Sequence, residues 1–596
     1  MSIARPDNTV RSNFWRDFWT LFKPYWFSEE KRNARLLLSG VVALTLASVY
    51  MDVLFNDWYN SFYNTFQDKN MPEFFRQMGR FALLATVWIV IGVYATYLNQ
   101  MLQVRWRRWL TEKYLTEWLA NRTYYRMQLA GGQTDNPDQR VSEDLKMFVD
   151  QTLSLSLGLL KSVVTLIAFV GILWTLSGTL EFKVGGQGYV LYGYMVWVAL
   201  AYALVGTWFT HVIGRPLIGL NYHQQRYEAD FRFNLVRFRE NVDGVALYRG
   251  EEDEMRGFRS RFQEVFSNWW QIMRRQKFLN FYINGYSQVA IIFPYLVAAP
   301  RFFSGAIPLG GLMQIANAFG HVQDSLSWFI NVYSGNGPNT GFAGWKATVD
   351  RLTGFHNAIA ACNSPGLTGP EAAITRASGP GMRALQLTKL NLRLPNGQPL
   401  LSDVSLSIEQ GARVLIQGPS GSGKSTLFRA IAGIWPFGNG NIIQPTQFQA
   451  LFLPQRPYFP LGTLSEAVCY PAPAGTFGDD QIREVLNAVG LGYVLGRLNE
   501  SANWSMQLSG GEQQLVAFAR ALLHKPNWLF LDEASSHLDH TNQARLYELV
   551  LSRLEHTTIV SIAHRDELAC YHPTHIELRA NGGGTHVLRT AQPEPA

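Results

Sequence analysis

The sequence predicts a multi-domain membrane protein in which a six-helix α transmembrane domain precedes an α/β domain built around a phosphate-binding loop. Three observations predict this fold class. The chain of 596 residues is too long for one compact core. Hydrophobic residues make up 47% of it, whereas charged residues fall to 16%, against about 25% in soluble proteins. Beyond residue 380, short apolar strands alternate with helical stretches, and no apolar run of membrane-spanning length recurs.

The net charge of the chain and its cysteines narrow the class of protein further. A net charge of +7 is compatible with a nucleic-acid partner, but Lys and Arg recur between apolar stretches instead of forming one block, which favours a membrane surface. Cys362, Cys469 and Cys570 form no CxxC pair, so we expect neither a disulfide framework nor a zinc site, and reduced thiols in the cytosol. No small-residue cleavage site follows the first apolar run, so we expect the N-terminus to be retained.

The N-terminal part, residues 1–33, is predicted to form a cytoplasmic or interfacial elbow helix. Residues 13–26 place aromatic side chains at helical spacing and interleave them with Arg16, Asp17 and Lys23. This pattern is typical of a helix that lies in the membrane interface. An ordinary surface helix fits the pattern equally well.

A transmembrane domain is predicted over residues 34–355. Six apolar segments long enough to span a bilayer occur at residues 36–55, 81–98, 155–176, 189–209, 278–299 and 309–333. The connection 212–277 holds eleven Arg and one Lys and the connection 99–154 is also basic, whereas 177–188 and 300–308 are poor in both residues. Basic connections face the cytoplasm. We therefore expect both ends of the chain inside, with helices that continue from the membrane into the two long connections.

Polar and aromatic residues gather at the outer end of the first span. They are Asp52, Asn56, Asp57, Trp58 and Asn60. One interpretation makes them the wall of a polar cavity, and the other a wet helix end at the membrane interface; the sequence favours neither.

A linker rich in Gly, Pro, Ser and Ala is predicted over residues 356–382, and a nucleotide-binding domain over 383–596. In this domain the pattern G-x-x-x-x-G-K-S directly follows the apolar strand RVLIQ and precedes a helix. In that context glycines let backbone N–H groups wrap phosphate oxygens, and the helix N-terminus favours anions. The predicted ATP-binding residues here are Gly418, Pro419, Ser420, Gly421, Ser422, Gly423, Lys424, Ser425 and Thr426.

Lys424 is expected to reach the β and γ phosphates, and Ser425 to bind Mg²⁺. A second element, WLFLDE, is a buried strand that ends in Asp532 and Glu533. Asp532 is predicted to help hold Mg²⁺, and Glu533 to orient the attacking water as a general base. Together the two elements predict ATP hydrolysis.

The segment LSGGEQQ lies between these elements and resembles the signature motif of ABC ATPases. The resemblance implies that Leu508, Ser509, Gly510, Gly511 and Glu512 contact ATP bound to a partner copy, and hence a homodimer. It also implies that Gln455 in LPQRPY contacts nucleotide and Mg²⁺, and that His564 in SIAHR contacts the γ-phosphate as a catalytic residue. Two departures stand out: His537 replaces a small residue in SHLD, and no aromatic residue lies near Leu394 to stack on adenine.

Three further sequence segments indicate a narrower family. TDNPDQRVSEDL at 134–145, GIWPFGNGNI at 433–442 and LFNDWYNSFY at 54–63 resemble SbmA/BacA-like proteins of the YddA type, which fuse a membrane domain to a cassette and are related to ABC subfamily D, the peroxisomal fatty-acyl-CoA transporters. The resemblance implies a type IV ABC exporter-like fold in the bacterial inner membrane, with the cassette in the cytoplasm. It further implies ATP-driven uptake of hydrophilic solutes such as peptides or cobalamin-like compounds.

Alternative functions remain open at this stage. Within transport, the cargo could be fatty acyl-CoA or another amphiphile, or the direction could be multidrug or peptide export. Outside transport, a soluble ABC ATPase that acts on DNA or ribosomes conflicts with the six apolar segments. A membrane sensor that uses the cassette as a switch is distinguished from a pump by ATP-dependent movement of solute.

Overall fold

The computed structural model describes residues 13–129, 136–184, 187–334, 341–363, 374–379, 381–563, 566–581 and 585–590. The chain divides into two compact units. One contains Asp7–Glu117 and Thr134–Asn357 and is here named the membrane unit. The other contains Trp118–Gln133 and Ala358–Ala596 and is named the cassette unit.

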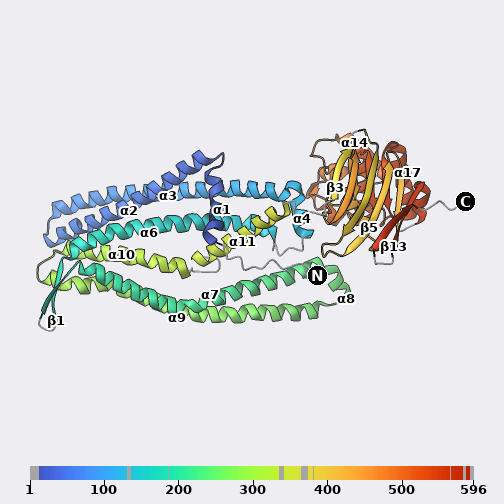
Figure 1. The fold of residues 1–596 in the computed structure, drawn as a ribbon. Helices are drawn as coiled ribbons and strands as arrows, with labels where there is room; N and C mark the ends of the chain where they lie inside the picture. The colour runs from blue at the N-terminus through green and yellow to red at the C-terminus, as the bar shows by residue number, and fades with distance from the viewer. Residues whose placement is uncertain are drawn as a thin grey trace. The chain divides into compact units, whose positions relative to one another are not determined.

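The membrane unit is built from long helices (Figure 1). They are α2 (Lys31–Gln67), α3 (Met71–Leu119), α6 (Leu145–Ser177), α7 (Tyr194–Glu240), α9 (Glu251–Phe303), α10 (Leu309–Ser334) and α11 (Gly341–Asn363). Among the described residues, four helical segments are long and apolar enough to cross a membrane: Lys31–Gln67, Met71–Leu129, Pro137–Ser177 and Tyr194–Glu240. The other two predicted spans lie within α9 and α10, where polar residues such as Asn284 and Gln288 lower the hydropathy. As predicted, α7 and α9 continue far beyond their apolar segments.

A β-hairpin separates α6 from α7. Its strands, β1 (Thr179–Val184) and β2 (Gln187–Tyr192), pair in antiparallel fashion. The predicted span 189–209 therefore begins too early, because residues 187–192 are extended and the helix begins at Tyr194. Gly193 makes the break with φ at 63°, and a Cβ atom there would lie 2.4 Å from the Trp174 ring, so the junction requires glycine.

Helix α1 (Phe14–Trp26) lies against the long helices through an aromatic face. Tyr25 stacks on Trp106 of α3 with ring centroids 5.6 Å apart, and Phe18 contacts Trp345 of α11 at 5.1 Å. The opposite face leaves Trp15 and Trp19 more than half exposed. Helix α1 thus has one face that packs on protein and one that presents indole rings, as expected for a helix that lies in the membrane interface.

A buried ion cluster fixes the start of α6. It follows α5 (Pro137–Gln139) and the π-helical turn η2 (Arg140–Asp144). The Asp144 carboxylate is 1% exposed, accepts from Arg140 at 2.5 Å, and accepts two hydrogen bonds from Arg351 of α11 at 2.7 and 3.0 Å. A buried carboxylate is tolerated only when it is paired in this way. The described part of the segment that carries the family resemblance, residues 136–145, thus ties α6 to α11.

Short helices complete the connections between long ones. These are η1 (Ala120–Arg122), α4 (Thr123–Leu129) and α8 (Val242–Tyr248). The first two follow α3 directly and belong to the cassette unit, against whose core Leu129 packs.

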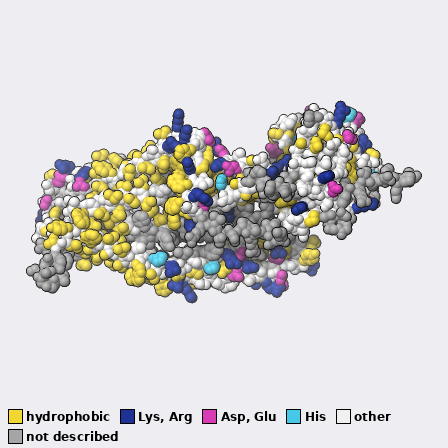
Figure 2. Space-filling model, viewed as in Figure 1, with side chains coloured by type: hydrophobic (Ala, Val, Ile, Leu, Met, Phe, Trp, Pro, Cys, Tyr) yellow, Lys and Arg dark blue, Asp and Glu magenta, His cyan; other side chains and the backbone are white. Residues whose placement is uncertain are grey.

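Exposed apolar side chains form a broad area on the membrane unit (Figure 2). Leu83, Ile89 and Val93 on α3 and Ile167 on α6 are each more than half exposed. Water-soluble proteins rarely expose so large an apolar area, whereas lipid contact favours it.

Ten of the described strands of the cassette unit form one large sheet in the order β3-β7-β4-β5-β14-β13-β6-β12-β11-β8. They are β3 (Ile374–Gly379), β4 (Ala384–Arg393), β5 (Pro399–Glu409), β6 (Arg413–Gln417), β7 (Gly438–Pro445), β8 (Ala450–Leu453), β11 (Trp528–Asp532), β12 (Thr558–Ile562), β13 (Thr574–Asn581) and β14 (Thr585–Thr590). Strands β13, β6, β12, β11 and β8 run parallel, so their carboxyl ends lie at one edge. The short strands β9 (Gly462–Thr463) and β10 (Ser501–Ala502) pair separately.

Helices bury both faces of this sheet. They are α12 (Lys424–Ile431), α13 (Leu464–Cys469), α14 (Asp479–Val489), η4 (Gly492–Arg497), α15 (Trp504–Gln507), α16 (Gly510–His524), α17 (His540–Arg553) and η5 (Asp566–Tyr571). One core contains α12, and another contains α13, α14, α16 and α17. The parallel strands read as continuous apolar runs because both of their faces are buried.

Candidate functional site

The phosphate-binding loop joins β6 to α12. Three of its glycines, Gly418, Gly421 and Gly423, have φ values of 151°, 79° and 96°, which disfavour any residue with a side chain. A Cβ atom at Gly418 would also lie 3.0 Å from Leu578. Gly423 is the N-cap of α12, so the loop ends at a helix N-terminus, where free backbone N–H groups favour anions.

Lys424 and Ser425 open α12 and face the end of β11. The Lys424 ammonium donates to the carbonyl oxygens of Gly418 and Pro419 at 2.7 and 2.9 Å, and the Ser425 hydroxyl donates to Asp532 Oδ1 at 2.8 Å. Burial lowers the pKa of the Lys424 ammonium, an effect that the carboxylates of Glu533 and Asp532 oppose. Burial also raises the pKa of the Asp532 carboxyl.

Glu533 directly follows β11 in an unusual backbone conformation. Its φ is 50°, a left-handed value that costs energy for a residue with a side chain and is often found at functional sites. Its backbone N–H donates to the Ile562 carbonyl at 3.1 Å. Its carboxylate accepts a hydrogen bond from the Gln455 side-chain amide at 3.1 Å. The structure thus brings together five of the predicted site residues: Lys424, Ser425, Asp532, Glu533 and Gln455.

The signature segment forms the N-terminus of α16. Ser509 is the N-cap: its hydroxyl accepts from the Glu512 N–H, and the Glu512 carboxylate accepts from the Ser509 N–H at 2.7 Å. This capping box leaves Gly510 and Gly511 in the first turn, where N–H groups lack helical partners. Leu508 is buried and anchors the segment. His564, the predicted γ-phosphate contact, lies outside the described residues.

Gln514 of α16 connects the signature helix with the other elements of the site. Its side-chain amide is fully buried; the nitrogen donates to the Gln455 carbonyl oxygen at 3.1 Å and lies 3.2 Å from Ser536 Oγ. Its side-chain oxygen accepts from the His537 N–H at 3.0 Å. In the sequence, His537 is visible only as a departure from the family pattern, and no pattern predicts the contacts of Gln514.

Arginine side chains cap the far end of α12. Arg122 donates to the Ala432 carbonyl oxygen at 2.6 Å, and Arg376 of β3 donates to the Ala430 carbonyl oxygen at 3.1 Å. Carbonyl groups at a helix C-terminus lack helical partners and favour cations. The helix that begins at the phosphate-binding loop is therefore held at its other end by the connection that follows α3.

These residues fit a magnesium nucleotide. The loop offers backbone N–H groups and a buried ammonium to phosphates, and Ser425 and Asp532 offer neighbouring oxygen atoms, the donors that Mg²⁺ prefers. Leu394 has no aromatic residue beside it in the sequence and is partly buried against the cassette core, where Trp435 donates to the carbonyl oxygen of the preceding Arg393 at 3.0 Å.

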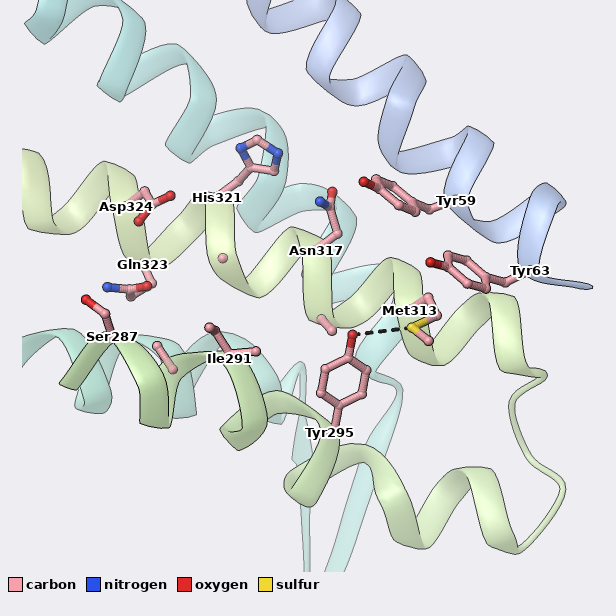
Figure 3. A pocket seen from close by; sticks show the side chains of 13 residues that line it. Tyr59, Tyr63, Ser287, Ile291, Tyr295, Met313, Asn317, His321, Gln323 and Asp324 are labelled. Carbon is pink, nitrogen blue, oxygen red and sulfur yellow. Dashed lines mark hydrogen bonds between the residues drawn. The ribbon is translucent and has the colours of Figure 1, made fainter. Parts of the chain in front are cut away.

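The membrane unit contains a second candidate site, a cavity of about 640 Å³ between α2, α9 and α10. Tyr59 and Tyr63 extend into it from α2, Tyr295 from α9, and Asn317 from α10 (Figure 3). Tyr295 donates to the Met313 sulfur at 3.3 Å. Gln323 and Asp324 of α10 also line the cavity, so hydroxyl, amide and carboxylate groups converge there.

The cavity-wall interpretation of the five residues on the first span needs correction. Asn56 is fully buried and donates to Gln314 O and Asn317 Oδ1 at 3.0 and 2.8 Å, so it binds α2 to α10. Trp58 donates to the Gln77 carbonyl oxygen at 2.9 Å, and Asp57 pairs with Arg80 at 2.8 Å, both joining α2 to α3.

Asp52 and Asn60 do not line the cavity either. Asp52 is partly buried and lies within electrostatic range of His321, and the Asn60 side-chain oxygen accepts from Asn64 at 3.0 Å. Tyr59 and Tyr63 are the α2 residues in the cavity. Their spacing of four residues is the signal that could have identified them, because it places both on one helix face.

A membrane unit of long helices, fused to an α/β unit with a phosphate-binding loop, an acidic strand end and a signature helix, defines an ABC half-transporter. Residues 21–303 match the family model "ABC transporter transmembrane region 2", and residues 401–536 match the model "ABC transporter". The chain belongs to the ABC transporter family. It therefore binds and hydrolyses ATP to drive transport, and it is a membrane protein.

Relatives place the chain more narrowly. It is 35% identical to the inner membrane ABC transporter ATP-binding protein YddA of Escherichia coli (strain K12), over 91% of this chain and 94% of that protein. It is 28% identical to the human lysosomal cobalamin transporter ABCD4, over 98% of this chain and 97% of that protein. Its fold is similar to that of a bacterial Atm1-family ABC exporter with ATP bound, with a TM-score of 0.68, 17% identity and coverage of 93% and 94%. The predicted family and fold class are confirmed.

Proposed function

We propose that the protein is a homodimeric ABC half-transporter that imports hydrophilic solutes, such as peptides or cobalamin-like compounds, across a bacterial inner membrane. The cassette unit and both termini lie in the cytoplasm. The likeness to YddA, an inner membrane protein by name, supports the location. The likeness to ABCD4, a cobalamin transporter by name, supports a hydrophilic cargo.

The observation that carries the proposal is the lining of the cavity. Three tyrosine hydroxyls, the Asn317 and Gln323 amides and the Asp324 carboxylate face it. Hydrogen-bonding groups of this kind replace water around a polar solute, whereas an acyl chain would leave them unpaired at a cost of about 1–3 kcal/mol each. The polar lining therefore favours a hydrophilic cargo over fatty acyl-CoA or another amphiphile.

The cassette supplies the driving reaction. Lys424 and the loop N–H groups bind the phosphates, and Glu533, oriented by Gln455, accepts a proton from the attacking water. Ser425, Asp532 and Gln455 are the residues that hold Mg²⁺, which when bound neutralises phosphate charge. The predicted role of His564 at the γ-phosphate forms part of the proposal.

Dimerisation completes each ATP site. The signature residues Ser509, Gly510 and Gly511 of one copy face the nucleotide of the other, so closure of two cassettes follows ATP binding, and hydrolysis opens them. This cycle exposes the cavity alternately to the two sides of the membrane. The predicted division of the chain into elbow (1–33), transmembrane domain (34–355), linker (356–382) and nucleotide-binding domain (383–596) describes the parts that move.

A transport assay in proteoliposomes, in which the direction of solute movement is measured, tests the proposal. Purified protein is reconstituted, outward-facing cassettes are supplied with ATP, and movement of a tripeptide, cobalamin and palmitoyl-CoA is followed in separate samples. We expect tripeptide or cobalamin to leave the vesicle lumen towards the cassette side, and Glu533→Gln vesicles to show no movement. Movement towards the lumen would establish export instead. Movement of palmitoyl-CoA alone would refute a hydrophilic cargo.

A further inference from the structure

The charges around the cavity are unbalanced. Among the described residues that line it, Asp324 is the one carboxylate, and neither Lys nor Arg is present. His321 is the other lining side chain that can carry charge near neutral pH. Around His321 lie two carboxylates, Asp52 and Asp324, and one ammonium group, Lys161. The neighbourhood therefore carries a net negative charge when His321 is neutral.

The aromatic side chains that line the cavity also favour a positively charged solute. Tyr59 and Tyr63 are stacked, with ring planes within 8° of each other and centroids 6.0 Å apart, and Tyr295 lies on the opposite wall (Figure 3). The faces of tyrosine rings attract cations, and the attraction grows where water is excluded. An anionic solute would meet these rings and a carboxylate, with neither Lys nor Arg among the described wall residues to compensate.

We propose that Asp324 makes this cavity selective for hydrophilic solutes that carry a positive charge, such as an ammonium group, over anionic solutes of similar size. The inference rests on the proposed function and specifies its substrate class. Asp324 provides the charge, the tyrosines provide faces for the cationic group, and Asn317 and Gln323 provide hydrogen bonds for the rest of the solute. In a homodimer each copy contributes one such set.

The electrostatic part can be tested without knowing the natural solute. Ala316 lines the cavity from α10, and Ala316→Cys in a Cys570→Ser background introduces a thiol there, while Cys362 and Cys469 are buried. The probes are two methanethiosulfonates, one with a trimethylammonium group and one with a sulfonate. Their rates at this thiol are divided by their rates with 2-mercaptoethanol, which removes their intrinsic difference in reactivity.

We expect the cationic probe to be favoured roughly tenfold, because one unpaired charge at such short range acts through a medium less polar than water. Asp324→Asn should bring the ratio close to one. The control Asp57→Asn removes a carboxylate that is on α2, is paired with Arg80 and lies outside the cavity, and it should leave the ratio unchanged. Equal rates for both probes, or a ratio that survives Asp324→Asn, would overturn the inference. Ala290→Cys, on α9, repeats the measurement if Ala316→Cys does not fold.

A transport assay then distinguishes failure of this inference from failure of the proposed function. Proteoliposomes receive three matched tripeptides, Ala-Lys-Ala, Ala-Gln-Ala and Ala-Glu-Ala, with blocked ends. We expect the lysine peptide to move at least roughly fivefold faster than the glutamate peptide, with the difference lost in Asp324→Asn. Equal movement of all three would refute cation selection and leave hydrophilic transport intact. If no tripeptide moves while the probe ratio at Ala316→Cys holds, the cavity is cation-selective and the proposed cargo is wrong.

Discussion

The side-chain nitrogen of Gln514 lies 2.9 Å from Nδ1 of His537, and the His537 backbone N–H donates back to the Gln514 side-chain oxygen at 3.0 Å. The Gln514 nitrogen is a donor only, so the His537 ring accepts at Nδ1 and carries its proton on Nε2. Because Gln514 also donates to the Gln455 carbonyl, one buried amide fixes the residue whose side chain contacts Glu533. Within one chain, Gln514 thus joins the signature helix to Gln455 and Glu533; in the homodimer that we propose, these elements would serve two different ATP sites.

We predict that Gln514→Ala and His537→Ala lower the kcat of ATP hydrolysis by roughly three- to tenfold, since each leaves buried polar groups unpaired at about 1–3 kcal/mol. The KM for ATP should change little, because the phosphate-binding loop is untouched. His537→Asn, whose side-chain oxygen can accept from Gln514, should recover most of the rate. Steady-state ATPase assays of the reconstituted protein measure both constants. An unchanged kcat in His537→Ala would show that the contact does not position the base.

Glu533→Gln should bind ATP normally and lose turnover by roughly 100-fold or more, because the amide retains an oxygen for the Gln455 contact but cannot accept the proton. Nucleotide binding is followed with a fluorescent ATP analogue, and turnover by phosphate release. Lys424→Ala is the contrasting variant and should fail at binding. Wild-type turnover in Glu533→Gln would exclude Glu533 as the base.

Gly310→Ala should loosen the contact between α2 and α10. A Cβ atom at Gly310 would lie 2.0 Å from the Asn60 carbonyl oxygen, and the Gly310 N–H donates to Asn64 Oδ1 at 2.8 Å. We expect the free energy of unfolding to fall by about 1–3 kcal/mol, which is typical of overpacking. The matched control is Gly311→Ala, where the nearest atom lies at an ordinary 3.4 Å from the added Cβ. Thermal unfolding in detergent compares the two, and equal melting temperatures would contradict the predicted clash.

His572 should make the cassette unit sensitive to mild acid. Burial lowers the pKa of its ring, and the charges of His575 and Arg413 act in the same direction, partly opposed by the hydrogen bond to Leu568. Nδ1 lies 2.8 Å from the Leu568 carbonyl oxygen and must donate, so Nε2 accepts from Ser561 Oγ at 2.8 Å.

At pH 7.5 and above, the ring is almost entirely neutral in both folded and unfolded chains and adds little pH dependence. As the pH falls below 6.5, the unfolded chain takes up a proton first, so His572 lowers stability by up to about 1.4 kcal/mol per pH unit. His572→Asn, which keeps a donor for Leu568, should flatten this part of the profile. Hydrogen exchange of peptides that contain β12 at pH 5.5, 6.5 and 7.5 measures the difference. Parallel profiles for the two proteins would contradict the prediction.

The cassette was predictable because its chemistry is local. The loop at Gly418–Ser425 and the pair Asp532–Glu533 each lie at the end of an apolar strand, and parallel strands bring such ends to one edge. The contacts of Gln514 were not predictable, because they depend on loop conformations that place residues from distant segments around one amide. In the membrane unit, the positions of the long helices followed from the apolar runs, but the rotation of α2 about its own axis did not. Asn56 therefore binds α10 while Tyr59 faces the cavity.

The geometry of α12 has a mechanical consequence. Its eight residues extend for about 12 Å, with Lys424 of the phosphate-binding loop at one end and the Ala432 carbonyl group held by Arg122 just beyond the other. A helix this short behaves as a stiff rod, with no internal joint to absorb displacement. Through Arg122, the end of this rod contacts the chain segment that leads directly back into α3.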